Sequence, residues 1–322
     1  FLQSQVEVAT PVCGSLAEAR EQLLRLRTSA ADAASSEGCR LTAAATHPTA
    51  RWAAQEVTDR ERYQTLEHRM GQVARETLIC GMHVHVGIPK RADRIRVLDR
   101  IRPWLPVLLA LSASSPYWEG RDTGLDSFRT PTFRRWPQTG MPQPFADWAE
   151  YEDLVAALVD AGAISDGTNL YWDLRPSWRF DTVEVRIADM CTTVDEAVTL
   201  AGLTRALVWR ILAPDQVPAP ARTPRTEVLE AAVRRAARYG LSEQLLHPVN
   251  ASLAPAGRVV DALLAHCAPG LDALGDADLV AAGIDRIRST GNSATRQRAA
   301  YTRRGRWEDV VDALADETVA AL

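Results

Sequence analysis

Hydrophobic residues recur with a helical period along most of this 322-residue chain and alternate with polar residues in four short segments. Apolar residues that return every three or four positions predict helices, and these cover residues 15–28, 58–76, 91–113, 147–162, 193–213, 225–239, 257–267, 276–289 and 306–321. Alternation predicts strands over residues 4–9, 78–88, 169–175 and 181–188. Because the strands do not alternate regularly with the helices, the pattern predicts an α+β fold rather than a doubly wound parallel sheet.

Three predicted helices start with the spacing of a capping box, in which Ser or Thr is followed three residues later by Glu. These pairs are Ser15 with Glu18, Thr58 with Glu61, and Thr193 with Glu196. Residues 114–145 are rich in Gly, Pro and aromatic residues, and their length predicts an active-site loop rather than a plain connector. The Pro-rich residues 214–224 indicate a linker.

Each predicted strand has an apolar face and a sparse polar face, because residues two apart on a strand point the same way. Met82, Val84 and Val86 share one side of their strand, and the histidines between them share the other. The polar side chains placed in this way are Glu7, His83, His85, Asp173, Arg175, Glu184 and Arg186. Solvent-exposed faces are normal in antiparallel sheets but usually carry Thr, Ser, Lys and Gln, so the pattern favours a functional site.

The chemistry of these polar faces is suited to phosphoryl transfer. Carboxylates and imidazoles are ligands for Mg²⁺ or Mn²⁺, and guanidiniums bind phosphate through paired hydrogen bonds. The GxxxxGK[ST] and GxGxxG motifs are absent, so P-loop, kinase and Rossmann sites are excluded and a nucleotide would be held on the sheet by metal ions. His83 and His85 also fit the first ligand pair of a metal-dependent hydrolase, and that alternative stays open.

Composition narrows the class of protein. The chain has 37 basic and 41 acidic residues, a net charge of −4 and no basic stripe, which argues against nucleic acid as a partner. No segment approaches the ~20 apolar residues of a membrane span, and the first residues do not resemble a signal peptide. Five cysteines without a CxxC pair indicate free thiols. We therefore expect a cytoplasmic protein with no membrane partner.

The segment Cys80–Gly87 (CGMHVHVG) resembles the bacterial carboxylate–amine ligases of the glutamate–cysteine ligase type 2 family. Further motifs match in the same order, at residues 5–13, 46–48, 115–124, 171–176, 183–189, 237–241 and 296–298. The resemblance implies a glutamine-synthetase-like fold, in which the concave polar face of an antiparallel sheet binds Mg²⁺-ATP and helices back the other face. Because the motifs span nearly the whole chain, we expect one catalytic domain over residues 1–322.

This resemblance also implies the reaction. The family joins a carboxylate, typically the side chain of glutamate, to an amine such as that of cysteine. ATP first phosphorylates the carboxylate, and the amine then attacks the acyl phosphate. The expected partners are therefore small molecules, and apolar helix faces in the second half of the chain permit a homodimer.

The resemblance assigns roles position by position to Glu7, His83, Glu184 and Arg186, and the other site residues are candidates. The expected metal ligands are Glu7, His83 and Glu184, and the expected catalytic residues are Arg186 and Arg175. We expect His85, Arg296 and Arg298 to contact the nucleotide. We expect Arg121, Arg129 and Tyr117 to contact the substrate. The family opens with a strand of consecutive glutamates that supply further metal ligands, and nothing in this sequence matches it. We expect either that the given chain lacks this strand or that the protein binds fewer metals. A non-catalytic nucleotide- or metabolite-binding relative therefore stays open beside the ligase.

Overall fold

The computed structural model describes residues 1–213 and 224–320, so most of the predicted linker at 214–224 lies outside the described residues. The helices are α1 (Leu16–Ser36), α2 (Glu61–Met70), α3 (Gln72–Arg75), α4 (Arg91–Ile101), α5 (Leu105–Ser112), α6 (Arg129–Phe133), α7 (Trp148–Asp160), α8 (Val194–Leu212), α9 (Thr226–Tyr239), α10 (Ala256–Leu274), α11 (Ala277–Thr290), α12 (Ser293–Arg304) and α13 (Trp307–Val319). Short 3₁₀ turns lie at η1 (Trp52–Ala54), η2 (Arg102–Trp104) and η3 (Gly167–Asn169). No helix among the described residues is both long enough and apolar enough to cross a bilayer.

The strands are short and mostly antiparallel. They are β1 (Val84–Gly87), β2 (Tyr117–Trp118), β3 (Arg121–Asp122), β4 (Thr139–Gly140), β5 (Tyr171–Trp172), β6 (Leu174–Pro176), β7 (Thr182–Val185), β8 (Gln244–Leu246) and β9 (Leu253–Pro255). In the central sheet, β7 lies between β1 and β6 and is antiparallel to both. Strands that pair without a regular helical crossover confirm the predicted α+β class.

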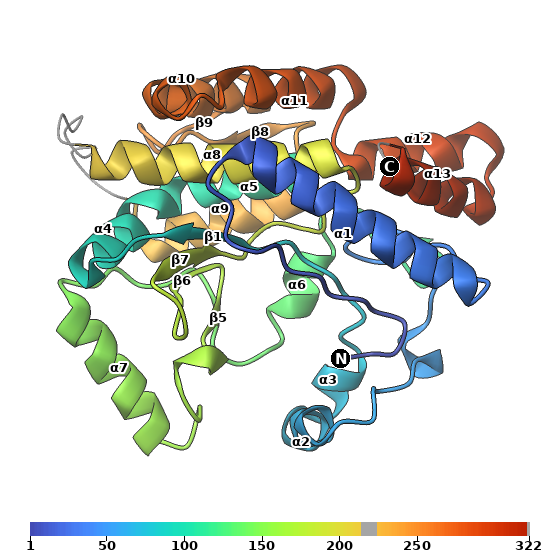
Figure 1. The fold of residues 1–322 in the computed structure, drawn as a ribbon, viewed down its shortest axis with the longest axis horizontal. Helices are drawn as coiled ribbons and strands as arrows, with labels where there is room; N and C mark the ends of the chain where they lie inside the picture. The colour runs from blue at the N-terminus through green and yellow to red at the C-terminus, as the bar shows by residue number, and fades with distance from the viewer. Residues whose placement is uncertain (214–223, 321–322) are drawn as a thin grey trace.

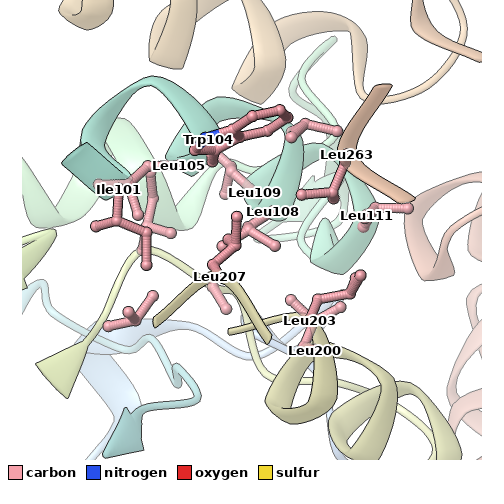
Figure 2. Packing of buried hydrophobic residues seen from close by; sticks show 14 of the residues in the cluster. Ile101, Trp104, Leu105, Leu108, Leu109, Leu111, Leu200, Leu203, Leu207 and Leu263 are labelled. Carbon is pink, nitrogen blue, oxygen red and sulfur yellow. The ribbon is translucent and has the colours of Figure 1, made fainter. Parts of the chain in front are cut away.

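Helix α8 lies at the centre of the apolar core. It packs against α1, α4, α5, α10 and α11, and it also contacts β1. Figure 1 shows α10 and α11 as an outer layer, with α8 and α5 between them and the sheet. The leucines of α8, among them Leu203 and Leu207, lie beside Leu108 and Leu109 of α5 (Figure 2). Each fully buried side chain of this kind contributes about 1.5–3 kcal/mol, so this core fixes the sheet from one side.

The central sheet turns its apolar face toward these helices. Val183 and Val185 of β7 and Leu174 of β6 are buried and belong to the same core cluster as the leucines of α5 and α8. Because side chains alternate along a strand, residues Glu184 and Arg175 must point to the opposite face. The alternation read from the sequence is therefore confirmed for β6 and β7.

One of the three predicted capping boxes forms, at Thr193, where both reciprocal hydrogen bonds are present. Ser15 caps α1 by accepting from the Glu18 N–H, but the Glu18 carboxylate accepts from the Gly14 N–H, so that box is incomplete. The prediction at Thr58 is wrong, because its N–H donates to the carbonyl oxygen of Phe1 in an extended segment and α2 begins at Glu61. The helix predicted over 91–113 is divided at η2, where Pro103 has no N–H to continue the ladder.

The predicted strand over 4–9 does not form in the described part of the chain. Val6 and Val8, which suggested an apolar face, are 63% and 46% exposed, and no residue of the segment joins a ladder. The predicted loop at 114–145 contains β2, β3, α6 and β4. Helix α12 was not predicted because its arginine-rich sequence lacks a continuous apolar stripe; it is capped by the Asn292 side chain, which accepts from Thr295 N–H.

Candidate active site

Three polar side chains lie in one row across the central sheet. His85 of β1 is the direct partner of Glu184 of β7, and Glu184 is in turn the direct partner of Arg175 of β6. In an antiparallel pair, directly opposed residues have Cβ atoms about 4.5–5.5 Å apart on the same face. The structure therefore brings together these three of the predicted site residues.

Glu184 occupies the centre of the row and is only 3% exposed. Arg175 Nε donates to one carboxylate oxygen of Glu184 over 2.8 Å, and Arg186 Nη1 contacts the other. Burial alone would raise the pKa of Glu184, but the guanidiniums of Arg186 and Arg175 outweigh it and lower this pKa to about 2. Glu184 is therefore an anion held between two cations at neutral pH.

Both predicted histidines reach the same carboxylate. His83 Nδ1 lies 3.4 Å from Glu184 Oε1, and His85 Nε2 lies 3.7 Å from it. Burial and the guanidinium of Arg186 hold the pKa of His83 well below its ordinary value, and burial also lowers that of His85. Imidazoles with pKa values below about 6.5 are neutral at pH 7, so each offers one lone pair on the polar face.

Arg186 keeps hydrogen-bonding capacity that the protein does not use. Its Nη1 contacts Glu184 and lies 3.3 Å from His83 Nδ1, whereas its Nε is buried without a partner among the described residues. A buried donor left unsatisfied costs about 1–3 kcal/mol. Arg186, beside the row, thus has a buried N–H donor without an acceptor among the described residues.

Arg129, predicted as a substrate contact, lies beneath the row and is 5% exposed. Its guanidinium donates to the carbonyl oxygens of Arg186 (3.1 Å) and Ile187 (3.2 Å). It lies so close to Gly81 that a Cβ there would overlap it. These contacts occupy Arg129 with backbone, so its observed role is to hold the end of β7 rather than to face a ligand.

Asp189 helps to hold Arg129 and the serines around it in place, and we had predicted no role for it from the sequence. It is fully buried, and its carboxylate accepts from Ser114 N–H, Ser115 Oγ and Ser127 Oγ over 2.7–3.0 Å. Arg129 Nη1 lies 3.9 Å from it. The only sequence signal was its place in the motif at 183–189, three residues after Arg186.

Arg296 and Arg298, predicted as nucleotide contacts, are occupied by carboxylates in the structure. Arg296 forms ion pairs with Glu196 (2.7 Å) and Glu317 (2.8 Å), which join α12 to α8 and α13. Arg298 pairs with Asp122 (2.9 Å) and also contacts Asp126. Arg298 lines a cavity together with Tyr117 and Arg121, and none of its lining residues belongs to the central sheet.

Glu7, the third expected metal ligand, lies exposed in the irregular segment before α1 and is not gathered with the others. Among the described residues, no three His, Cys, Asp or Glu side chains are arranged to hold a metal ion. The Glu184 carboxylate is a donor that suits Mg²⁺ or Mn²⁺, whereas an imidazole such as that of His83 is more typical of transition metals. The described residues of the polar face therefore do not form a closed protein site for a metal ion.

The family profile and two similar proteins indicate the same protein family. The profile described as Glutamate-cysteine ligase family 2 (GCS2) matches residues 1–313. A protein of Frankia alni named "Putative glutamate--cysteine ligase 2-2" is 43% identical over 316 residues, which are 98% of this chain and 82% of that protein. A "Putative glutamate--cysteine ligase 2-3" of Mycolicibacterium smegmatis is 42% identical over 317 residues, 98% of this chain and 87% of that protein.

A solved structure is also similar to this chain, at a lower sequence identity than these relatives. It is the Pup ligase PafA of the prokaryotic ubiquitin-like modification pathway in complex with ADP, at 14% identity and a TM-score of 0.47. The match covers 97% of this chain and 66% of that chain.

Proposed function

We propose, since this chain belongs to glutamate–cysteine ligase family 2, that the polar face of its central sheet catalyses ATP-dependent joining of a carboxylate to an amine. The donor carboxylate is the side chain of glutamate or a close analogue. Family membership supports the ligase class, and the chemistry of the row on β1, β7 and β6 supports the route through a phosphorylated carboxylate.

The reaction has two steps whose atoms balance. A carboxylate oxygen attacks the γ-phosphorus of ATP, the bond to the β-phosphate oxygen breaks, and an acyl phosphate and ADP form. The lone pair of a neutral amine then attacks the acyl carbon, inorganic phosphate leaves, and the amine proton passes to solvent. An enzyme accelerates both steps chiefly by positioning the reactants and stabilising the charge that develops.

The single observation that carries the proposal is the unsatisfied guanidinium of Arg186. Its Nε is buried without a partner in the described part of the protein, and it lies beside the neutral imidazole of His83. A transferred phosphoryl group supplies the acceptor oxygens that this donor lacks. We assign Arg186 to the transferred phosphate, with Arg175 holding Glu184 so that Arg186 stays in place.

His83 and Glu184 are the residues that would hold a divalent cation on this face, with Glu7 as a further ligand only if its segment moves toward them. Bound there, Mg²⁺ would neutralise charge on the nucleotide phosphates. His85, whose Nδ1 shares a 3.0 Å hydrogen bond with Thr182 Oγ1, is proposed as a neighbouring nucleotide contact. The nucleotide contacts expected of Arg296 and Arg298 stay predictions, because both side chains are engaged in ion pairs.

The test is ADP release from ATP and Mg²⁺ with glutamate and a panel of amines, with the product identified by mass. Arg186→Gln removes the phosphate contact and is expected to lower kcat by about 100-fold or more. Arg91→Gln removes an exposed arginine of α4, 63% exposed, and serves as the matched control with unchanged kcat.

Other outcomes separate the alternatives. Absence of ADP release with every amine refutes the ligase. Binding of ATP by calorimetry without turnover then identifies a non-catalytic nucleotide-binding relative. Stoichiometric zinc by elemental analysis, together with no use of ATP, favours a hydrolase built on His83 and His85.

A further inference from the structure

The turn between β6 and β7 carries two exposed aromatic side chains. Trp178 is 47% exposed and Phe180 is 64% exposed, although burying such a ring would contribute about 1.5–3 kcal/mol. The Trp178 ring packs on Gly167, where a Cβ would overlap it. Phe180 instead meets the ring of His85 at nearly a right angle, with the centroids 6.3 Å apart. Phe180 thus brings a largely uncovered ring to the edge of the polar face.

The turn itself is firmly held. Phe180 N–H donates to Ser177 Oγ over 3.3 Å, and the Phe180 carbonyl oxygen accepts from Thr182 N–H over 2.8 Å. Asp181 forms a 2.5 Å ion pair with Arg94 of α4, whose side chain is 6% exposed. Because the turn is already ordered, a ligand that covers the ring loses little free energy in ordering it.

The sheet surface beside this ring is open and uncharged. Gly87 of β1 is the direct partner of Thr182 of β7. This pair lies on the same face as His85 and Glu184, because each residue is two positions along its strand from one of them. Gly87 is exposed, and a Cβ built there has no neighbour within 4 Å among the described residues. The end of the face next to Phe180 therefore has room for a neutral group.

The distance along β7 matches the length of a nucleotide. Thr182, Glu184 and Arg186 follow one another on the polar face. At the usual rise of a strand, the four residues from Thr182 to Arg186 span about 13 Å. An extended ATP molecule has a comparable length from its γ-phosphate to its base. A γ-phosphate at Arg186 would therefore leave the base near Phe180, with His85 between the two ends.

The opposite end of the face is closed. Gly81 lies on the same face as Gly87, because residues two apart along the strand share a side. The place of a Cβ at Gly81 is taken by the Arg129 guanidinium, whereas the same place at Gly87 has no neighbour among the described residues. A flat group that follows the strand from Arg186 therefore finds room only toward Gly87.

We infer that Phe180 stacks on the adenine base of ATP and that Gly87 is the open floor beside it. This inference rests on the ligase function proposed above. The charged end of the face suits the phosphates, and the uncharged end suits the neutral base. Glutamate and a small amine such as cysteine have no flat ring to cover Phe180.

The test is calorimetric titration of the full chain with ATP and, separately, with inorganic tripolyphosphate, both with Mg²⁺. Phe180→Ala is expected to bind ATP about tenfold more weakly, because stacking of a base on an aromatic ring contributes about 1–3 kcal/mol. Its affinity for tripolyphosphate is expected to stay at the wild-type value. Phe180→Trp keeps a flat ring and is expected to bind ATP as the wild type does. Leu253→Ala, whose side chain is 51% exposed in β9, is the control with wild-type affinities.

Kinetics and a second position test the same contact. In the ADP-release assay Phe180→Ala is expected to raise KM for ATP about tenfold with kcat within about twofold, because the ring contacts a part of the nucleotide that does not react. Gly87→Val places a side chain that suits a strand in the space of the base, and it is expected to raise KM for ATP by at least the same factor. Thermal melts check that both variants are folded.

The failures are distinguishable. ADP release with KM for ATP in Phe180→Ala within twofold of wild type overturns this inference and leaves the ligase standing. A rise in KM for glutamate or for the amine instead of ATP assigns the ring to another substrate and also overturns it, as do equal losses of affinity for ATP and tripolyphosphate. No turnover with any amine refutes the proposed function, whereas tenfold weaker binding of ATP to Phe180→Ala would still support the position of the base.

Discussion

Arg175 Nε donates a 2.8 Å hydrogen bond to Glu184 Oε2 from the neighbouring strand, and the two residues are direct cross-strand partners. Arg186 contacts the other carboxylate oxygen, so two guanidiniums share a single buried anion and one positive charge is left over. Charges removed from water in this way depend on one another, because each loses its hydration and is compensated only by its partners. We therefore expect a substitution of Glu184 to lower both the stability of the fold and the proposed activity.

Glu184→Gln is expected to destabilise the protein by about 3–5 kcal/mol, because it keeps the shape of the side chain but leaves two buried guanidiniums without their anion. Urea unfolding measures the loss, and ADP release falls to background at temperatures where the variant is still folded. The matched control is Glu152→Gln, whose 50% exposed side chain pairs with Arg91 at 3.3 Å; its unfolding free energy should change by less than about 1 kcal/mol. Equal effects of the two substitutions would contradict the central role of Glu184.

The pH dependence of stability follows from the same residue. The pKa of Glu184 falls from its ordinary 4.5 to about 2 on folding, so the unfolded chain binds more protons in this window. Stability from the ion pair is therefore present above about pH 4.5 and is lost as pH falls toward 2, by about 3 kcal/mol in all. Unfolding free energies measured from pH 6 to pH 2.5 check this slope. If Glu184→Gln keeps the full wild-type slope, other carboxylates are responsible.

Strand alternation was enough to predict that His85, Glu184 and Arg175 lie on polar faces, because parity along a strand fixes the face of each side chain. The cross-strand register that sets them in one row is a finding of the structure. It could not predict how the residues of the row bind one another. Arg129 looked like a ligand contact in a loop, whereas tertiary packing turns it toward backbone carbonyls. Long-range contacts of this kind leave no periodic signal in the sequence.

The wrong prediction of a strand over residues 4–9 has a different cause. Alternation of Val6, Glu7 and Val8 predicted a strand, but a strand also needs a partner edge, and the described residues offer none to this segment. A strand is stabilised by its cross-strand pairs rather than by propensity alone. Arg296 shows the same limit, since the arginine-rich motif at 296–298 gave no sign that Glu196 and Glu317 would surround its guanidinium.

Gly81→Ala tests the packing of Arg129 beneath the sheet. A Cβ at this position overlaps the Arg129 guanidinium, whereas a Cβ at Gly87 of β1 has no neighbour within 4 Å. Overpacking of this kind costs about 1–3 kcal/mol, and displacement of Arg129 releases the carbonyl of Arg186. We expect Gly81→Ala to lower both the melting temperature and kcat, with Gly87→Ala close to wild type in melting temperature. Identical melting temperatures for the two variants would show that Arg129 moves aside without cost.

Arg296→Gln separates a structural role from contact with the nucleotide. The Arg296 guanidinium forms ion pairs with Glu196 of α8 and with Glu317 of α13, and it donates to the carbonyl oxygen of Gly291 over 2.8 Å. Glu196 is also part of the Thr193 capping box. Glutamine cannot bridge both carboxylates, and the Glu196 side chain is 7% exposed, so we expect a loss of about 3 kcal/mol in unfolding free energy. Because the guanidinium is already engaged, KM for ATP measured on the folded fraction should stay within about twofold of wild type. A tenfold rise in that KM would instead mean that Arg296 leaves its carboxylates when the nucleotide binds, as the motif at 296–298 led us to expect from the sequence.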